Sequence, residues 1–260
     1  MNRIEKKFQE LKKLKKPALI TYICAGDPNL KTTYELVLEL ERSGADIIEL
    51  GVPFSDPIAD GPTIQRAALR ALKKNTSLKD IVSLVGKLRK ESQIPILLMT
   101  YANPVYQFGV KKLAGSSQGN GVDGYIIPDL PPEAGREIRQ EFRKENVDLV
   151  YLASPLTDKR RLNIINHNSS GFIYYVSVTG VTGTRVSLPG EVSNQARSLR
   201  RLADKPVAIG FGVSNHVQVK KLAADFDGVI VGSAIVNIIE QNLGKKDLVE
   251  KVGKFVRSLK

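Results

Sequence analysis

The sequence predicts an α/β fold, a single (β/α)8 TIM barrel with an extra N-terminal helix. Short runs of β-branched and aliphatic residues recur eight times along the chain, separated by charged segments with the period of an amphipathic helix. This alternation is the pattern of repeated strand–helix units around a parallel sheet. Eight such units in about 250 residues are typical of a closed barrel.

An open doubly wound sheet is the alternative arrangement of the same elements. Such a fold usually carries a glycine-rich fingerprint directly after its first strand. Here that strand is followed only by "CAGDPN", which indicates a turn before the next helix. The barrel is therefore favoured, and functional residues are expected at the carboxyl ends of its strands.

The eight strands are predicted at 18–24, 46–51, 95–101, 124–129, 148–153, 172–177, 207–212 and 228–233. The helices between them are predicted to begin near Thr32, Thr63, Leu78, Val110, Pro132, Asp158, Glu191, Ser214 and Ala234. The charged amphipathic segment 1–16 predicts a further helix that caps the bottom of the barrel. We expect one domain over 1–260, because 260 residues of which 42% are hydrophobic suffice for one large core.

The composition argues against several classes of protein. The net charge of +12 raises the question of nucleic-acid binding, but the basic residues are scattered over predicted outer helix faces. No RNA-binding aromatic motif or zinc-finger spacing is present, so we expect no nucleic-acid partner. Without a signal-peptide-like run or ~20 consecutive apolar residues, the protein is expected to be cytoplasmic, with no membrane contact. The single Cys24 and the distant His167 and His216 predict no disulfide and no metal site.

The stretch from Ile48 to Gln65, "IELGVPFSDPIADGPTIQ", places three carboxylates close together. Glu49 lies near the carboxyl end of the predicted strand 46–51, among the apolar neighbours Ile47, Ile48 and Leu50, so its carboxyl is expected to be dry. A dry carboxyl has a raised pKa and exchanges protons near neutral pH, as a general acid and base must. The alternative is a buried Glu paired with Lys or Arg, but no predicted strand contains either residue.

Asp56 and Asp60 lie on the loop after this strand. Asp60 is as consistent with a helix N-cap or a turn as with catalysis, because Asp is favoured in both of those places. The Ser-Asp-Pro sequence around Asp56 favours an ordinary turn.

Glycine-rich segments follow the last three predicted strands: "GVTGT", "GFGVSN" and "VGSAIV". In barrels, phosphate groups commonly bind the loops after strands 7 and 8 and the N-terminus of a short helix. A glycine after a strand is usually only a turn, but three such segments on adjacent loops predict a phosphate site.

"IELGVPFSDPIADG" resembles the signature of the tryptophan synthase alpha chain family. The segments "ITYICAGDPN", "LLMTYANPVYQFGV", "GYIIPDLPPEAG", "YYVSVTGVTGTR", "AIGFGVSN" and "GVIVGSAIV" are also similar to that family and occur in the same order, so the likeness covers essentially the whole chain. It implies a carbon–carbon lyase that cleaves indole-3-glycerol phosphate into indole and glyceraldehyde 3-phosphate by a retro-aldol reaction.

The resemblance also implies residue roles. Glu49 would shuttle protons, and Asp60 would hold the indole N–H. The indole pocket would be lined by Tyr22, Met99, Ile126 and Tyr174, with core packing nearly as good an explanation for Met99 and Ile126. The phosphate would be bound by Gly183, Phe211, Gly212, Gly232 and Ser233. The lid would be the segment 178–191, whose Thr182 would meet Asp60 on closure. Three positions depart from common family residues: Val178 for Arg, Tyr22 for Phe and Cys24 for Thr.

The resemblance further implies a complex of two alpha and two beta chains, in which indole passes to the beta chain. The contact would involve loop 52–58 with Pro53 and Asp56, the "YANPVYQFG" segment with Asn103, and the "DLPPE" loop. No cofactor is expected in this chain, because pyridoxal phosphate would belong to the beta chain. A regulatory subunit without catalysis and another phosphate-binding barrel such as an isomerase are the alternatives. The regulatory subunit is disfavoured because Glu49, Asp60, Thr182 and Gly183 are intact. The isomerase is disfavoured by the paired carboxylates.

Overall fold

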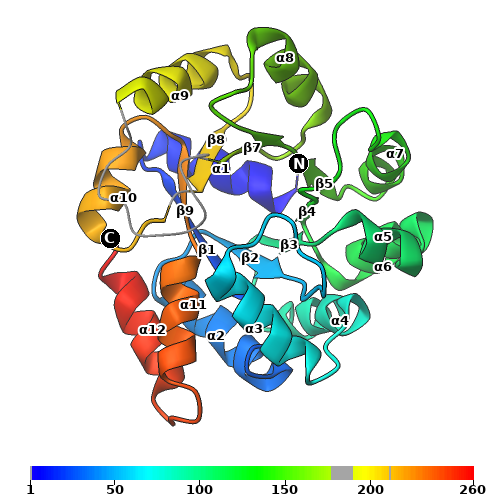
Figure 1. Cartoon of the computed structure of the whole chain (residues 1–260), viewed down its shortest axis with the longest axis vertical. Helices are drawn as coiled ribbons and strands as arrows, with labels where there is room; N and C mark the ends of the chain where they lie inside the picture. The colour runs from blue at the N-terminus through cyan, green and yellow to red at the C-terminus, as the bar shows by residue number, and fades with distance from the viewer. Residues whose placement is uncertain (1, 177–189, 211) are drawn as a thin grey trace.

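Parallel strands form a closed barrel whose outer side is covered by helices, as the sequence predicts (Figure 1). The structure is a computed structural model, and it describes residues 2–176, 190–210 and 212–260. No helix in these three ranges combines the length and apolar character that crossing a membrane requires.

The strands among the described residues follow each other around the barrel in the order β5-β4-β3-β2-β1-β9-β8-β7-β6, and every paired neighbour is parallel. Their bounds are β1 Ala18–Cys24, β2 Ile47–Gly51, β3 Ile96–Met99, β4 Gly124–Ile126, β5 Asp148–Val150, β6 Leu152–Ala153, β7 Ile173–Val176, β8 Val207–Gly210 and β9 Gly228–Val231.

The predicted fifth strand is split into β5 and β6 around Tyr151. The first part pairs with β4, and the second part pairs with β7. Tyr151 is where the pairing changes sides, and its carbonyl accepts the N–H of Tyr174 at 3.1 Å. This single segment therefore closes the barrel.

The helices are α1 Arg3–Lys13, α2 Leu30–Arg42, α3 Pro62–Leu72, α4 Leu78–Leu88, α5 Ala102–Phe108, α6 Val110–Asn120, α7 Arg136–Lys144, α8 Lys159–Asn168, α9 Gly190–Leu202, α10 His216–Ala223, α11 Ser233–Gln241 and α12 Leu248–Arg257. Side-chain caps start several of them: Asn29 caps α2, Ser77 with Asp80 forms a capping box at α4, and Asp158 caps α8.

Two helices, α5 and α12, were not predicted. The sequence of α5 contains Pro104, but this proline lies in the first turn, where its missing N–H has no acceptor within the helix. The helix predicted to begin near Ala234 is α11, and α12 follows it after a turn in which Gly244 has a φ of 77°. This left-handed conformation favours glycine and ends the helical run.

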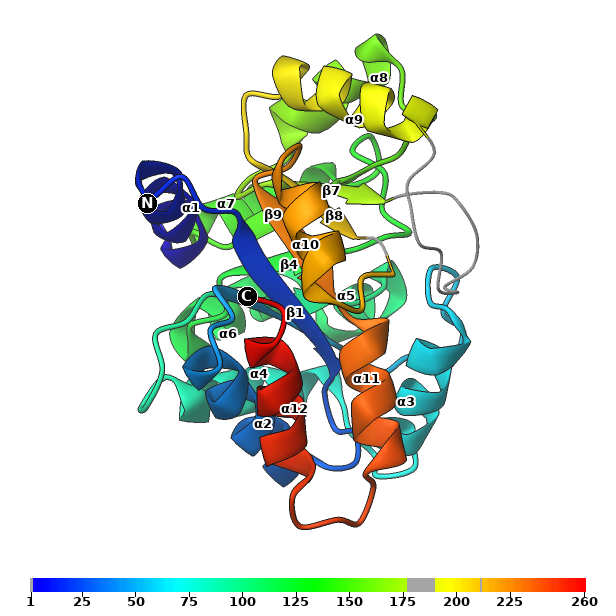
Figure 2. The same cartoon turned by 90° about the vertical axis from the view of Figure 1, so that its left-hand side faces the viewer.

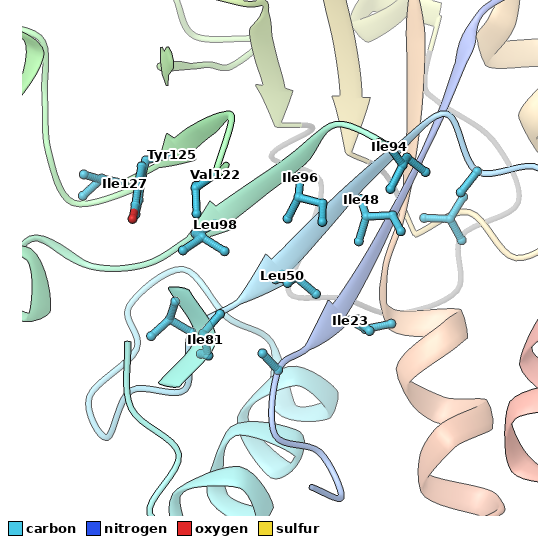
Figure 3. Close-up of a cluster of buried hydrophobic side chains, with 14 of the residues drawn as sticks. Ile23, Ile48, Leu50, Ile81, Ile94, Ile96, Leu98, Val122, Tyr125 and Ile127 are labelled. Carbon is cyan, nitrogen blue, oxygen red and sulfur yellow. The ribbon is translucent and has the colours of Figure 1, made fainter. Parts of the chain in front are cut away.

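Strand alternation separates two apolar layers. Figure 3 shows part of the outer layer, where Ile23, Ile48, Leu50, Ile96 and Leu98 point from their strands toward the surrounding helices. The inner layer fills the barrel itself with Ala18, Ile20, Ile47, Leu97, Ile126, Val150, Phe172, Ala208 and Ile230. Because side chains alternate between the two faces of a strand, Ile47 and Glu49 share the inner face of β2.

Helix α1 lies at the end of the barrel where β1 begins (Figure 2). Its Ile4, Phe8 and Leu11 lie on one face at helical spacing and join the inner layer. The ring of Phe8 lies 5.6 Å from the ring of Phe172, centroid to centroid. The helix therefore closes the barrel floor with apolar surface.

Polar contacts tie the start of α1 to the same floor. The Arg3 guanidinium contacts Asp123 at 3.0 Å, and Asn2 donates a hydrogen bond to Asp148. Burial raises the pKa of Asp148 to about 6, although hydrogen bonds from Asn2 and Ser170 favour its ionised form.

We expect the stability of the fold to depend on the protonation of Asp148. The pKa of Asp148 is raised in the folded state. Its contribution to the free energy of unfolding is therefore fully present below about pH 4 and is lost as the pH rises through about 6. Two pKa units correspond to about 3 kcal/mol. The free energy of unfolding, measured in urea from pH 4 to 8, should therefore fall for the wild type relative to Asp148→Asn. A difference that stays constant with pH would contradict this assignment.

Candidate active site

Glu49 lies inside the barrel near the carboxyl end of β2. In register it stands between Tyr22 of β1 and Leu97 of β3. The residue is 1% exposed, and neither carboxylate oxygen has a hydrogen-bond partner among the described residues. Burial raises its pKa to about 8, with a further contribution from the charge of Asp60. The described part of the chain contains no salt bridge to Glu49, so the alternative of a paired structural Glu finds no support there.

Asp60 is half-buried on the loop between β2 and α3. The N-cap of α3 is Gly61 rather than Asp60, so the N-cap interpretation is wrong. Burial raises the pKa of Asp60, and a hydrogen bond with the Tyr101 hydroxyl partly offsets this effect. The site therefore holds two carboxyls in unlike surroundings: Glu49 is dry and has no hydrogen-bond partner among the described residues, and Asp60 is half-buried beside Tyr101.

Two tyrosines, Tyr22 and Tyr174, flank the carboxyls. Burial raises the pKa of both phenols, and the charges of Glu49 and Asp60 raise them further. Each ring needs a glycine beside it. A Cβ on Gly51 would lie 2.0 Å from the Tyr22 hydroxyl, and one on Gly210 would lie 2.6 Å from that of Tyr174.

The other two predicted pocket residues differ from each other. Met99 is half-buried and packs against both the inner layer and a cluster that contains Tyr22. Ile126 is 0% exposed within the inner layer. Core packing therefore accounts for Ile126, whereas Met99 retains surface for a ligand.

The predicted phosphate residues are only partly covered by the structure. Gly232 and Ser233 form the start of α11, and no side chain caps its first amides, so these N–H groups are available to an anion. Gly212 is exposed in the loop before α10. Thr182, Gly183, Phe211, Val178 and all of the predicted lid except its last two residues lie outside the described residues.

Comparisons with known proteins agree over the full length of the chain. The sequence model of the tryptophan synthase alpha chain family matches residues 8–260. The tryptophan synthase alpha chains of Geotalea uraniireducens (strain Rf4) and Thermoanaerobacter sp. (strain X514) are 46% and 45% identical over 260 residues, covering 100% of this chain and 97% and 99% of the relatives.

This chain belongs to the tryptophan synthase alpha chain family. The resemblance seen in the motifs is thereby confirmed. Its structure is similar to that of tryptophan synthase subunit alpha from Legionella pneumophila str. Paris, with a TM-score of 0.93 and 39% identity over 100% of this chain and 97% of that one. A tryptophan synthase complex from Pyrococcus furiosus matches with a TM-score of 0.86 and 39% identity, over 94% of this chain and 98% of that one.

The residues predicted to contact a beta chain follow the carboxyl ends of β2 and β3 and differ in exposure: Pro53 and Asp56 lie on a loop, and Asn103 lies in α5. Asp56 and Asn103 are exposed, whereas Pro53 is buried. Ile58 and Leu156, on loops after β2 and β6, are apolar side chains that are 78% and 83% exposed. Exposed apolar side chains beside polar ones are a common composition for a protein interface.

No group of three or more His, Cys, Asp or Glu residues in the described ranges is arranged to hold a metal ion. Cys24 is buried, and burial raises the pKa of its thiol, so it is a poor nucleophile.

Sequence reasoning missed Tyr101. This residue follows β3 and was treated only as the end of a strand and as part of a partner segment. Its hydroxyl accepts the N–H of Ala59 at 3.1 Å, and its ring stacks on Phe54. The available signal was that a buried phenol requires a polar partner, but the identity of that partner depends on the fold.

We expect Gly51→Ala to displace Tyr22 and to destabilise the protein by about 1–3 kcal/mol, because the buried ring has no free space beside it. Gly115→Ala is the matched control, since a Cβ there meets nothing within 4 Å and an exposed helix gains up to about 1 kcal/mol from alanine. Urea unfolding measures the difference in the free energy of unfolding between the two variants. Equal stabilities would show that the site relaxes around the added methyl group.

Proposed function

We propose that this chain is the alpha subunit of a tryptophan synthase, a carbon–carbon lyase that cleaves indole-3-glycerol phosphate to indole and glyceraldehyde 3-phosphate. The observation that carries the proposal is the dry carboxyl of Glu49, whose pKa of about 8 keeps it protonated at neutral pH. Such a group is a general acid in its resting state and becomes a base once it has given up its proton.

The reaction needs one proton delivered and one removed. Protonated Glu49 donates to C3 of the indole ring, and positive charge develops on the ring nitrogen. The Asp60 carboxylate accepts a hydrogen bond from the ring N–H and stabilises that charge. Glu49, now ionised, takes the proton from the adjacent side-chain hydroxyl. The carbon–carbon bond breaks as its electrons return to the ring, giving indole and an aldehyde with no net change in protons.

The substrate is oriented by its two ends. Tyr22, Tyr174 and Met99 are proposed as the walls of the indole pocket, and Ile126 supports them from the inner layer. The phosphate is proposed to bind the free amides at the start of α11, at Gly232 and Ser233, with Gly212 beside them. Thr182, Gly183 and Phe211 are assigned to the same end from the resemblance alone.

The partner is proposed to be a tryptophan synthase beta chain. One structural neighbour is a Pyrococcus furiosus a2b2 complex described as mutually activating. The contact is proposed at Pro53, Asp56 and Asn103. The pyridoxal phosphate of the reaction that consumes indole is assigned to the beta chain, and this chain needs no cofactor of its own. We place the complex in the cytoplasm.

Glu49→Gln and Asp60→Asn should each lower indole release by roughly 10²–10⁴-fold, because each removes a group that transfers a proton or stabilises charge in the transition state. Indole is measured with the purified chain alone and with a beta chain. Glu35→Gln, on the outer helix α2, is the control and should match the wild type. Should the wild type release no indole while still activating a beta chain, the chain is a regulatory subunit.

The pH dependence of kcat/KM should reflect the protonation of both Glu49 and Asp60. The activity should fall as the pH rises through about 8, because Glu49 loses the proton that it must donate. It should also fall on the acid side as Asp60 is protonated, at a higher pH than an exposed Asp would require, because burial raises its pKa. A profile that is flat from pH 7 to 9.5 would exclude Glu49 as the acid.

A further inference from the structure

Two helices, α3 and α11, begin at the candidate active site and lie side by side (Figure 1 and Figure 2). Helix α3 starts two residues after Asp60, and the side-chain amide of Gln65 in its first turn donates to the Asp60 carbonyl at 2.8 Å. Helix α11 starts after Gly232, which lies close against Tyr22: a Cβ on this glycine would lie 3.2 Å from the Cβ of the tyrosine. A shift of either helix would therefore move a part of the site.

The apolar contact between the two helices consists mostly of small side chains. Val236 of α11 shares a buried cluster with four residues of α3, and three of these four are alanines: Ala67, Ala68 and Ala71. Alanines form low ridges, so they let two helices approach closely but oppose sliding only weakly. The relative position of α3 and α11 along their lengths therefore depends on other contacts.

Ion pairs join the two helices far from their starts. Glu240, near the end of α11, accepts hydrogen bonds from Arg66 of α3 at 2.9 and 2.8 Å and from Arg70 of α3 at 2.6 Å. The hydrogen bond from Arg66, with a second one from Arg70, lowers the pKa of Glu240 to about 2, so this carboxylate is ionised at neutral pH.

The second of these arginines also fixes α3 to the barrel. Arg70 donates two hydrogen bonds, at 2.8 and 2.9 Å, to Asp27 on the loop after β1, and Asp27 is only 1% exposed. Such ion pairs add little net stability, because the loss of hydration offsets much of the attraction. They do impose geometry, because a guanidinium that binds a carboxylate through two parallel bonds has one preferred arrangement.

We propose that Glu240 is a positioning residue that keeps α3 and α11 in register, and thereby sets the separation between Asp60 and the phosphate-binding amides at the start of α11. This inference rests on the proposed function, because only a ligand with an indole at one end and a phosphate at the other spans both helix starts. A change of register weakens the binding of such a ligand. A ligand that occupies one end alone is unaffected by it.

The decisive variant is Glu240→Ala, which releases the far end of α11 and leaves the pair of Arg70 with Asp27 in place. Dissociation constants are measured by NMR titration of the ¹⁵N-labelled chain with three probes. These are inorganic phosphate, indole, and indole-3-propyl phosphate, which is the proposed substrate without its two side-chain hydroxyl groups.

Glu240→Ala should bind indole-3-propyl phosphate about tenfold more weakly than the wild type, as expected when one hydrogen bond to a charged phosphate is lost. It should bind inorganic phosphate and indole as the wild type does. Glu240→Gln keeps an oxygen that accepts from the arginines, so it should retain most of the affinity for indole-3-propyl phosphate.

Glu39→Ala is the matched control. Glu39 also joins two outer helices, because it accepts a hydrogen bond from Arg257 at 2.9 Å, but these are α2 and α12, which carry no residue proposed to bind the substrate. All three dissociation constants should match those of the wild type. A purely structural role of Glu240 predicts the same result for Glu240→Ala, with a lower free energy of unfolding and unchanged binding.

The wild type tests the proposed function, and Glu240→Ala tests the inference. A wild type that binds indole-3-propyl phosphate no better than inorganic phosphate or indole overturns both, because no ligand then spans the two helices. When the wild type does bind it better, equal affinity in Glu240→Ala overturns the role of Glu240 alone, and so does an equal loss for all three probes. If Glu240→Ala does not fold, Arg66→Met removes the outer pair only. This variant should show the same selective loss to a smaller degree, and unchanged affinity overturns the inference.

Discussion

The burial of one carboxyl without a partner is the constraint on which the rest of the site depends. Burial penalises an ionised carboxylate, so the pKa of Glu49 rises to about 8 and the residue is protonated at neutral pH. A lysine or arginine on a neighbouring strand would restore the ordinary pKa and remove the acid. None of the strands in the described part of the chain contains either residue. Among the described residues, the lysines and arginines therefore lie on helices and loops rather than on the strands.

The same interior also has to hold two tyrosine rings beside the carboxyl. Gly51 and Gly210 provide the space, since a Cβ at either position would lie within 3.0 Å of a phenol oxygen. The surroundings of the carboxyl are thus formed by two rigid rings against glycine backbone, with few rotatable bonds to order when a substrate binds. The low conformational entropy cost of such walls favours a planar ligand such as indole.

The elements of the fold that could be predicted from the sequence are those with a regular spacing of hydrophobic residues. The strand runs, their alternation and the dry position of Glu49 follow from the order of apolar residues, because burial of one face determines the register. Local exceptions were not predictable from periodicity. Helix α5 exists although Pro104 lies within it, and the N-cap of α3 is Gly61 although Asp60 is the better capping residue. Asp60 instead lies near Tyr101, which is 41 residues away in the sequence and lowers its pKa, and only the folded barrel brings the two together.

Stability and chemistry occupy opposite ends of the barrel. At the floor, Asp46, Asp123 and Asp227 each accept a backbone N–H of a neighbouring strand at 2.8 Å, and α1 closes the interior. These carboxylates have donors, so they stabilise the ladder in which they lie. Toward the carboxyl ends of the strands, the carboxyl of Glu49 has no donor among the described residues, and its raised pKa lets its protonation change near neutral pH. Donors to the Glu49 carboxylate would favour its ionised form and lower its pKa, so the residue would no longer hold at neutral pH the proton that it must donate.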